Sequence, residues 1–191
     1  QCAIISAMKP LLILAFLSAP AWADPCPPAP DNTAALSKLI EQIRAAPNES
    51  AARPISGQMW ELWLMAPDEA AQEVLDRGMR QRSSYDFAGS VASFDRLVAY
   101  CPDYAEGYNQ RAFSYFLTEN FENALVDLDA ALRLSPDHVG AQSGRALTLM
   151  NLGRIEEART QMQEALENNP WLSERALLAK GAPLGPKGED I

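Results

Sequence analysis

A 34-residue period runs through residues 71–172 of this chain. Four of its columns hold prolines, arginines or small residues: Pro102, Pro136, Pro170; Arg77, Arg111, Arg145; Gly78, Ala112, Ala146; and Ser90, Ala124, Ala158. Two more columns hold large apolar residues: Phe87, Phe121, Ile155; and Phe94, Leu128, Met162. Because all six columns share one register, the period is a repeat. Its length is typical of a helix-turn-helix unit that buries its apolar face only against neighbouring copies.

The central copy, residues 105–138, resembles the tetratricopeptide repeat (TPR) family through Tyr108, Ala112, Tyr115, Ala124, Leu128, Ala131 and Pro136. The next copy, residues 139–172, carries Gln142, Ala146, Leu149, Gly153, Ala158, Met162, Ala165 and Pro170, where Gln142 departs from the usual aromatic residue. The first copy, residues 71–104, is divergent, since Gln81 stands where Tyr115 and Leu149 stand. The resemblance implies an all-α, right-handed α-solenoid of helical hairpins.

The register predicts the helix boundaries. Repeat helices are expected at 69–82, 86–99, 105–117, 121–134, 139–151 and 155–168, followed by a cap helix at 173–180 and a flexible tail at 181–191. Before the repeats, a leader and a helical hairpin are expected within residues 24–70. The first helix of this hairpin begins at Asp31 or Asn32, and the second covers 56–65. We expect the hairpin to close the N-terminal end of the stack.

Residues 1–23 read as a secretory signal peptide. An apolar stretch at 10–23 follows Met8 and Lys9 and ends in Ala-Trp-Ala, a small-x-small cleavage pattern. Residues 1–7 are interpreted as an over-long start. Cleavage after Ala23 predicts a periplasmic or secreted protein that keeps no stable membrane anchor.

The chain is acidic and keeps two cysteines after the signal peptide. The formal net charge is −9, and loss of Lys9 with the signal peptide makes it about −10, which repels nucleic acid and anionic lipid. We therefore expect no nucleic-acid partner. In an oxidising compartment Cys26 and Cys101 are expected to form a disulfide that attaches the proline-rich leader to the first repeat. The alternative is two free buried thiols.

Signals for catalysis are weak. The one histidine, His138, follows Pro136 in a turn and is expected to be an exposed loop residue rather than a metal ligand or general base. No motif for a metalloprotease, a P-loop or a nucleophile elbow is present in the sequence. Trp60 and Trp63 share one helix face and are interpreted as core. The sequence predicts no enzyme activity, no cofactor and no metal.

The arginine column has two interpretations. Asp95 and Asp129 occur at equivalent places on second helices, so Arg111 and Arg145 could pair with them across repeats in a structural ladder. Alternatively, Arg77, Arg111 and Arg145 bind a carboxylate of an acidic partner. Their identical phase favours the structural interpretation.

The TPR resemblance implies binding of a peptide or partner helix along the concave surface of the first helices. Projected onto this sequence, the groove is lined by Gln72, Leu75, Met79, Arg82, Glu106, Asn109, Gln110, Phe113, Phe116, Ser143, Leu147 and Met150. The lysine-rich clamp with which some members hold a terminal carboxylate is not matched. The whole mature chain also resembles small exported proteobacterial TPR proteins in phrases such as WELW at 60–63 and YCPDYAEGYNQRA at 100–112.

Two classes of function follow from this resemblance. The first is a periplasmic scaffold or chaperone-like adaptor that binds another protein in the groove. The second is an accessory or regulatory subunit of a cell-envelope or cytochrome assembly complex, which docks through its convex face or its Trp60–Trp63 end. A further hypothesis is that the acidic tail at 189–191 folds back and occludes the groove.

Overall fold

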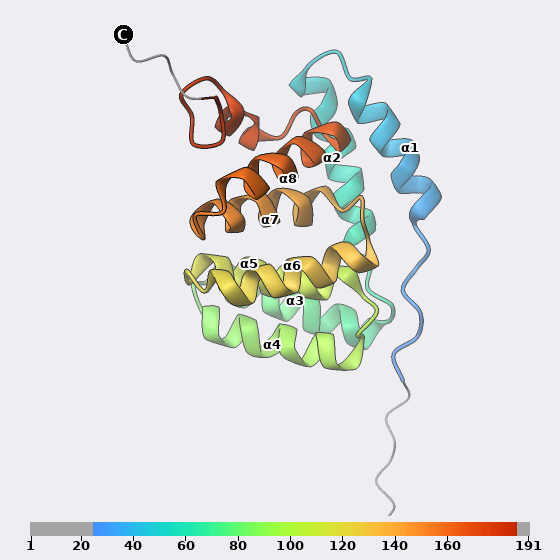
Figure 1. The fold of residues 1–191 in the computed structure, drawn as a ribbon. Helices are drawn as coiled ribbons and strands as arrows, with labels where there is room; N and C mark the ends of the chain where they lie inside the picture. Colours follow the sequence, from blue (N-terminus) through green and yellow to red (C-terminus); the bar gives the residue numbers. More distant parts are fainter. Residues whose placement is uncertain (1–24, 187–191) are drawn as a thin grey trace, which may run out of the picture.

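The computed structural model describes residues 25–186, and every regular element within that range is helical. Six helices form three hairpins: α3 (Glu69–Ser83) with α4 (Phe87–Tyr100), α5 (Ala105–Leu117) with α6 (Phe121–Leu134), and α7 (Val139–Asn151) with α8 (Ile155–Asn168). The hairpins stack in chain order (Figure 1). The all-α solenoid is confirmed, and the six predicted repeat helices match to within one residue at each end, because the 34-residue register fixes where each helix begins and ends.

Each hairpin turns through the same backbone geometry. Tyr85, Glu119 and Gly153, spaced 34 residues apart, all have positive φ, at 64°, 59° and 75°. In each turn the following N–H donates to a carbonyl five residues earlier, as from Asp86 to Gln81 at 2.9 Å. This is the left-handed helix ending that glycine favours. The first two repeats adopt it with a bulkier residue.

Small residues allow the paired helices to approach closely. A Cβ added at Gly78 would lie 2.5 Å from the ring of Phe94, which is fully buried. Between repeats, the hydroxyls of Ser90 and Ser114 lie 2.8 Å apart in a buried contact. Ala112 and Ala124 pack with Leu128 in the central repeat. The small and large columns of the sequence therefore form the core.

Two helices precede the stack: α1 (Thr33–Arg44) and α2 (Glu49–Trp63). Helix α2 starts seven residues before the predicted 56–65 segment, because the Asn48 side chain caps it by accepting from the Ala51 N–H at 3.0 Å. Pro54 lies inside the helix and removes one backbone donor. Burial of Ala52, Met59 and Trp63 on the same helix outweighs that loss.

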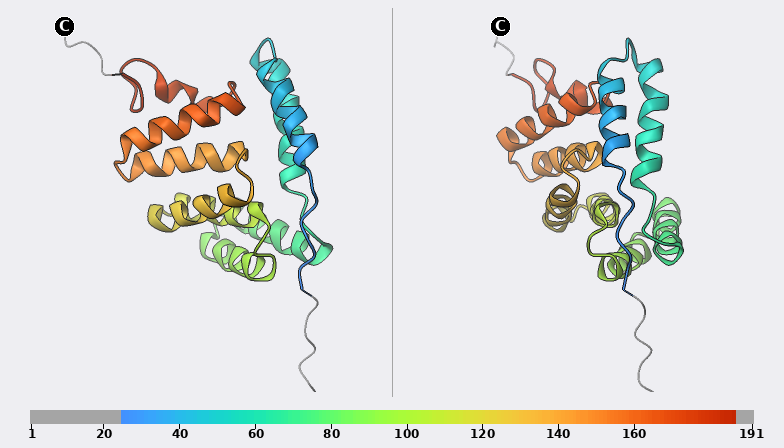
Figure 2. Two further views of the ribbon diagram at one scale, coloured as in Figure 1. Left: turned by 45° about the vertical axis from the view of Figure 1, so that its right-hand side comes forward. Right: turned by 90° about the vertical axis from the view of Figure 1, so that its right-hand side faces the viewer.

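The α1–α2 hairpin does not close the N-terminal end of the stack, and that prediction is wrong. Both helices run across the ends of the repeat helices (Figure 2), and α1 contacts α8. The reason is the outer face of α3, which carries the charged residues Glu73, Asp76, Arg77 and Arg80. The positions equivalent to Glu73 and Arg80 are Gly107 and Ser114 in α5 and Ala141 and Thr148 in α7, which are small enough for a packed helix.

Cys26 and Cys101 form a disulfide, as expected from the sequence. The bond joins the leader before α1 to the end of α4, across 75 residues of chain. Cys101 is buried in the cluster that also contains Leu97 and Tyr104. The leader is thereby fixed against the first repeat.

The C-terminal end differs from the prediction in two ways. The cap expected at 173–180 is a short 3-10 helix, η1 (Ser173–Leu178). The tail predicted to be flexible from residue 181 is packed as far as the structure describes it, because Leu184 is fully buried beside Met162. Arg159 donates to the Leu184 carbonyl at 2.7 Å. Residues 187–191, including the acidic tail of the occlusion hypothesis, lie outside the described residues.

Candidate functional site: the concave face of the stack

The first helices of the three hairpins form the inner face of the stack. Helix α5 contacts both α3 and α7, whereas the second helices α4, α6 and α8 lie farther from one another. A stack whose first helices are closer together than its second helices curves toward the first helices. The predicted groove residues therefore lie on the concave side or beside it.

The structure divides the twelve predicted groove residues by burial. Leu75 is fully buried in the core of the first repeat. A polar set, Glu106, Asn109, Gln110 and Ser143, is also buried. The remaining seven are partly or well exposed: Gln72, Met79, Arg82, Phe113, Phe116, Leu147 and Met150. We call the buried polar set the inner shelf. We call Met79, Arg82, Phe113, Phe116, Leu147 and Met150 the outer groove.

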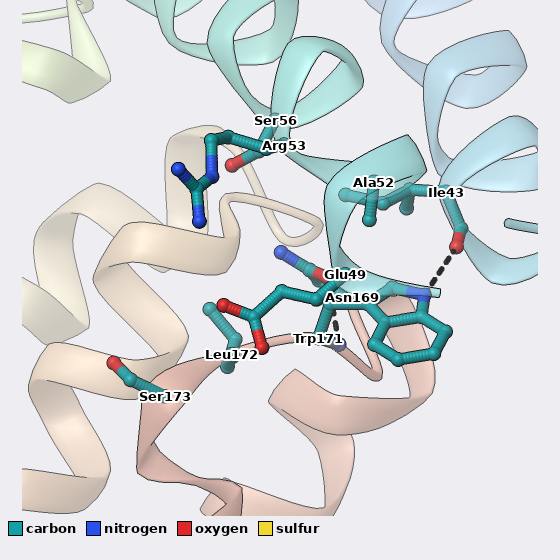
Figure 3. A pocket seen from close by; sticks show the side chains of 9 residues that line it. All are labelled: Ile43, Glu49, Ala52, Arg53, Ser56, Asn169, Trp171, Leu172 and Ser173. Atoms are coloured by element: carbon teal, nitrogen blue, oxygen red, sulfur yellow. Dashed lines mark hydrogen bonds between the residues drawn. The ribbon is translucent and has the colours of Figure 1, made fainter. Parts of the chain in front are cut away.

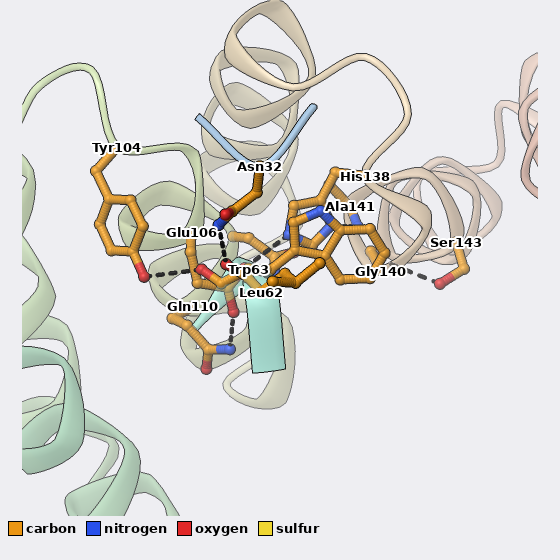
Figure 4. Close-up of polar contacts among 11 residues, drawn as sticks. Asn32, Leu62, Trp63, Tyr104, Glu106, Gln110, His138, Gly140, Ala141 and Ser143 are labelled. Carbon is orange, nitrogen blue, oxygen red and sulfur yellow. Dashed lines mark hydrogen bonds and ion pairs between the residues drawn. The ribbon is translucent and has the colours of Figure 1, made fainter. Parts of the chain in front are cut away.

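The inner shelf is centred on the buried carboxylate of Glu106 (Figure 4). One carboxylate oxygen accepts from the Gln110 amide. The other lies 2.7 Å from Nε2 of His138 and accepts from the Asn109 amide at 3.1 Å. Three partners offset the cost of removing this charge from water. The carboxylate is thus fully engaged within the protein.

His138 is fully buried, so its predicted exposure in a loop is wrong. It is the N-cap residue of α7, and its Nδ1 accepts from the Ala141 N–H at 3.2 Å. That bond leaves the ring proton on Nε2, where it is donated to Glu106. His138 is therefore a structural link between α5 and α7. The equivalent residue 34 positions earlier is Tyr104, the N-cap residue of α5. The presence of an aromatic ring at both positions was the sequence signal that could have predicted the burial of His138.

The α1–α2 hairpin covers this region of the concave face. Trp63 stacks on the His138 ring with the centroids 4.2 Å apart. The Tyr104 hydroxyl donates to the Trp63 carbonyl at 2.8 Å. A Cβ at Gly140 would lie 2.5 Å from the Trp60 ring. The prediction that the two tryptophans are core is confirmed for Trp63, which is buried, while Trp60 packs at the edge of the same cluster. The inner shelf is closed to a ligand while the hairpin is in place.

The outer groove stays accessible. The Phe113 side chain is 47% exposed, and the Arg82 guanidinium lies 4.5 Å from its ring centroid. Arg82 also donates to the Gln110 carbonyl at 3.2 Å. Burial lowers the pKa of Arg82 below its usual value, and the charge of Glu106 opposes that shift, so the group remains a cation. The outer groove can hold an apolar side chain against Phe113 with a positive charge beside it.

The arginine column is a structural ladder in the second and third repeats. Arg111 contacts Asp95 of the preceding repeat at 2.8 Å, and Arg145 contacts Asp129 at 2.7 Å, as predicted. The sequence interpretation missed Asp127, which binds two nitrogens of Arg111 at 2.7 Å each. The hydrogen bonds with Asp127 raise the pKa of Arg111, while burial raises the pKa of Asp127 despite this partner.

Arg77 stands apart from the other two arginines because its ion pair within residues 25–186 is with Glu73 on its own helix, at 2.7 Å. No second helix precedes α3 in the stack, so no cross-repeat aspartate is available to it. Arg111 and Arg145 are engaged in these cross-repeat ion pairs and do not contribute to the outer groove.

Within residues 25–186, no three His, Cys, Asp or Glu side chains lie together in a way that could hold a metal ion. Over the same range, none of the helices combines the length and the apolar character needed to cross a bilayer. The predicted signal peptide at 1–23 lies outside the described residues.

Known proteins share the repeat. Residues 115–180 match the family model described as tetratricopeptide repeat. A TPR repeat-containing protein of Rhizobium etli is 32% identical over 117 residues, which make up 61% of this chain and 50% of that protein. The chain spans half the length or less of the first curated relatives that it matches.

Solved structures share the fold. The first TPR of Spaghetti (RPAP3), bound to the HSP90 peptide SRMEEVD, superposes with a TM-score of 0.55 at 22% identity, over 56% of this chain and 84% of that one. The TPR2B domain of yeast Sti1 in its pHsp70 complex gives a TM-score of 0.53 at 19% identity, over 58% and 88%. At these identities the likeness concerns the fold alone.

Proposed function

We propose that this chain is a non-enzymatic adaptor that binds a peptide or partner helix in its outer groove. The chain belongs to the tetratricopeptide repeat family, whose members generally act in protein-protein interaction. The observation that carries the proposal is the pairing of a half-exposed Phe113 with Arg82 on the concave face. Aromatic and arginine side chains are the residues most often responsible for binding energy at protein interfaces. The covered inner shelf restricts the partner to the outer groove.

Structural neighbours support a peptide as the partner. The RPAP3 domain holds an HSP90 peptide and the Sti1 domain an Hsp70 peptide. The outer groove of this chain is mostly apolar, since it includes Phe113, Phe116, Leu147 and Met150. We therefore propose a partner segment that presents apolar side chains to α5 and α7.

We propose a periplasmic or secreted location. Support comes from the signal-like sequence at 1–23 and from the Cys26–Cys101 disulfide, since such bonds persist in oxidising compartments. The second candidate function is an accessory subunit of an envelope or cytochrome assembly complex. Trp63 is already buried within the protein, so this alternative depends on the convex face. The 66% exposed Val126 on α6 is the observation that favours it.

Site-specific photocrosslinking separates the two functions. A photoreactive phenylalanine analogue replaces Phe113 in one variant and Val126 in another, and each variant is expressed in the native host. The adaptor proposal predicts a discrete crosslinked partner from position 113 and none from position 126. A partner captured only from position 126 would favour the accessory subunit and contradict the groove.

A matched substitution checks the same point. Phe113→Ala removes the exposed aromatic side chain and should leave the free energy of unfolding within about 0.5 kcal/mol of wild type, since surface changes are usually small. The same variant should lose the partner that is crosslinked from Leu147. Retention of that partner at wild-type yield would count against the outer groove.

A further inference from the structure

A cavity of about 270 Å³ lies where α2 meets the chain that follows α8 (Figure 3). Its apolar lining comes from three separate segments: Ile43 at the end of α1, Ala52 on α2, and Trp171 with Leu172 after α8. The Trp171 indole N–H donates to the Ile43 carbonyl at 3.2 Å, which fixes one wall. The cavity lies outside the groove, and the proposed adaptor function does not use it.

The polar lining of the cavity has hydrogen-bond donors that are not used. Asn169 is 95% buried, and its Oδ1 accepts from the Trp171 backbone N–H at 3.0 Å. This contact fixes the orientation of the amide and leaves Nδ2 as a donor without a partner among residues 25–186. The Arg53 guanidinium has no carboxylate partner in the same range, and the Ser56 hydroxyl has no bond there either. These three donors line the same cavity as the apolar side chains of Ile43, Ala52 and Leu172.

The one carboxylate in the lining is already occupied. Glu49 lies 2.9 Å from Arg175, which also donates to the Trp171 and Leu172 carbonyls at 2.9 Å each. This ion pair joins α2 to η1 at the rim of the cavity and leaves Glu49 unable to neutralise Arg53 fully. The cavity therefore has an excess of donors and positive charge, in a protein whose net charge is −9.

We propose that this cavity binds a small carboxylate that carries a short aliphatic chain. The carboxylate accepts from Arg53, the Asn169 amide and the Ser56 hydroxyl, and the aliphatic chain lies against Ile43, Ala52 and Leu172. An arginine-carboxylate pair with added neutral donors is a strong form of anion recognition. The volume is just below the usual range for ligand pockets, which begins at about 300 Å³, and so selects a small ligand. A bound ligand would join α2 to the segment after α8.

Hexanoate is the probe, and titration is followed by the indole N–H signal of Trp171 in a two-dimensional NMR spectrum. Hexylamine reverses the charge, hexanol removes it, and inorganic phosphate removes the chain. The proposal predicts a saturable shift with hexanoate, a weaker one with hexanol and none with hexylamine. No saturable shift with hexanoate, or an equal one with hexylamine, would overturn it. A phosphate response as strong as that of hexanoate would also overturn the assignment to an aliphatic carboxylate.

Arg53→Gln is the test variant, and Arg133→Gln on the exposed surface of α6 is its matched control. Loss of a charge-assisted hydrogen bond should weaken hexanoate binding by about tenfold or more. The Arg133 variant should bind as wild type does. Both side chains are exposed, so both variants are expected to fold, and circular dichroism checks this. Equal hexanoate affinity in the Arg53 variant and the wild type would contradict the site.

Discussion

The two edges of the repeat stack are built from the same 34-residue register and are used in different ways. One edge, the loop edge, consists of the connections between repeats at 101–104, 135–138 and 169–172, and the α1–α2 hairpin covers it. Each of the three connections contacts the hairpin: Tyr104 and His138 contact Trp63, and Trp171 donates to the Ile43 carbonyl. The opposite edge, the turn edge, consists of the turns at 84–86, 118–120 and 152–154. Tyr85 on this edge is 83% exposed.

The difference shows that a repeat determines its own turns but not what covers them. On the turn edge every bond is local, and φ at the central position is set by the helix ending alone. On the loop edge the contacts join residues up to 128 positions apart. Covering one edge closes the inner shelf and leaves the outer groove open to a partner.

Of the substitutions at the two edges, Trp63→Ala on the covered loop edge should lower the free energy of unfolding most. It removes a buried ring that stacks on His138, and truncation of a buried aromatic residue costs about 3–5 kcal/mol. Urea unfolding measures the loss. The matched change on an exposed surface, Val126→Ala, should alter stability by less than about 0.5 kcal/mol. Equal losses in the two variants would mean that the hairpin does not stabilise the loop edge.

Cys26→Ser, which removes the disulfide, should cause the second-largest loss of stability. The disulfide closes a loop of 75 residues, and removing such a cross-link costs about 2–4 kcal/mol. Reduction of the wild type should lower the free energy of unfolding to the value of the variant. If oxidised and reduced wild type unfold at the same urea concentration, the leader contributes nothing to the covered edge.

Tyr104 predicts a dependence on alkaline pH. Burial raises its pKa above the ordinary value of 10.0, and the charge of Glu106 adds to that shift. In the unfolded chain the phenol ionises near pH 10, whereas the folded form holds its proton. Stability from this group is therefore complete below pH 10 and is lost as the pH rises above it, by about 1.4 kcal/mol per pH unit.

Tyr104→Phe isolates this contribution. The variant loses the hydrogen bond to the Trp63 carbonyl, which should cost about 1 kcal/mol at neutral pH. Above pH 10 the free energy of unfolding of the variant should fall less steeply with pH than that of wild type, by about 1.4 kcal/mol per pH unit. Parallel pH profiles for the two proteins would show that Tyr104 is not buried in solution.

On the turn edge, by contrast, one substitution should raise the stability of the protein. Glu119 adopts a left-handed backbone at φ 59°, where the third repeat has Gly153. Because that conformation costs a non-glycine residue about 1–2 kcal/mol, partly offset by the greater freedom of glycine in the unfolded chain, Glu119→Gly should raise stability by about 0.5–1 kcal/mol. Gly153→Ala should lower it by a similar amount. Thermal unfolding measures both, and destabilisation by Glu119→Gly would contradict the turn geometry.

Much of the stack could be predicted because its determinants are local. The prolines, the small columns and Gly153 set the helix ends, and the aspartates opposite Arg111 and Arg145 are visible at fixed spacing. The disulfide followed from counting cysteines. His138 was placed wrongly because a residue after proline in a turn is usually solvated, whereas here the distant Trp60 and Trp63 pack against its ring.

The position of the hairpin could not be read from its own sequence. Its apolar faces demand burial but do not say against which surface. The charges on α3 exclude the N-terminal end, and that exclusion becomes visible only when Glu73 and Arg80 are compared with Gly107 and Ser114. The packing of Leu184 was missed for a related reason. The many glycines and prolines of the tail predicted a flexible segment, and the sequence does not show the surface against which Leu184 is buried. The inner shelf was recognised as polar, but its burial depended on the hairpin.

The most direct test of the covered edge is the nuclear Overhauser effect between the ring protons of Trp63 and His138 in the intact protein. The stacked rings, 4.2 Å apart at their centroids, predict strong cross-peaks between them. Absence of these cross-peaks, in spectra that show the helix contacts within α3–α8, would mean that the hairpin leaves the concave face open and that the inner shelf is free to bind.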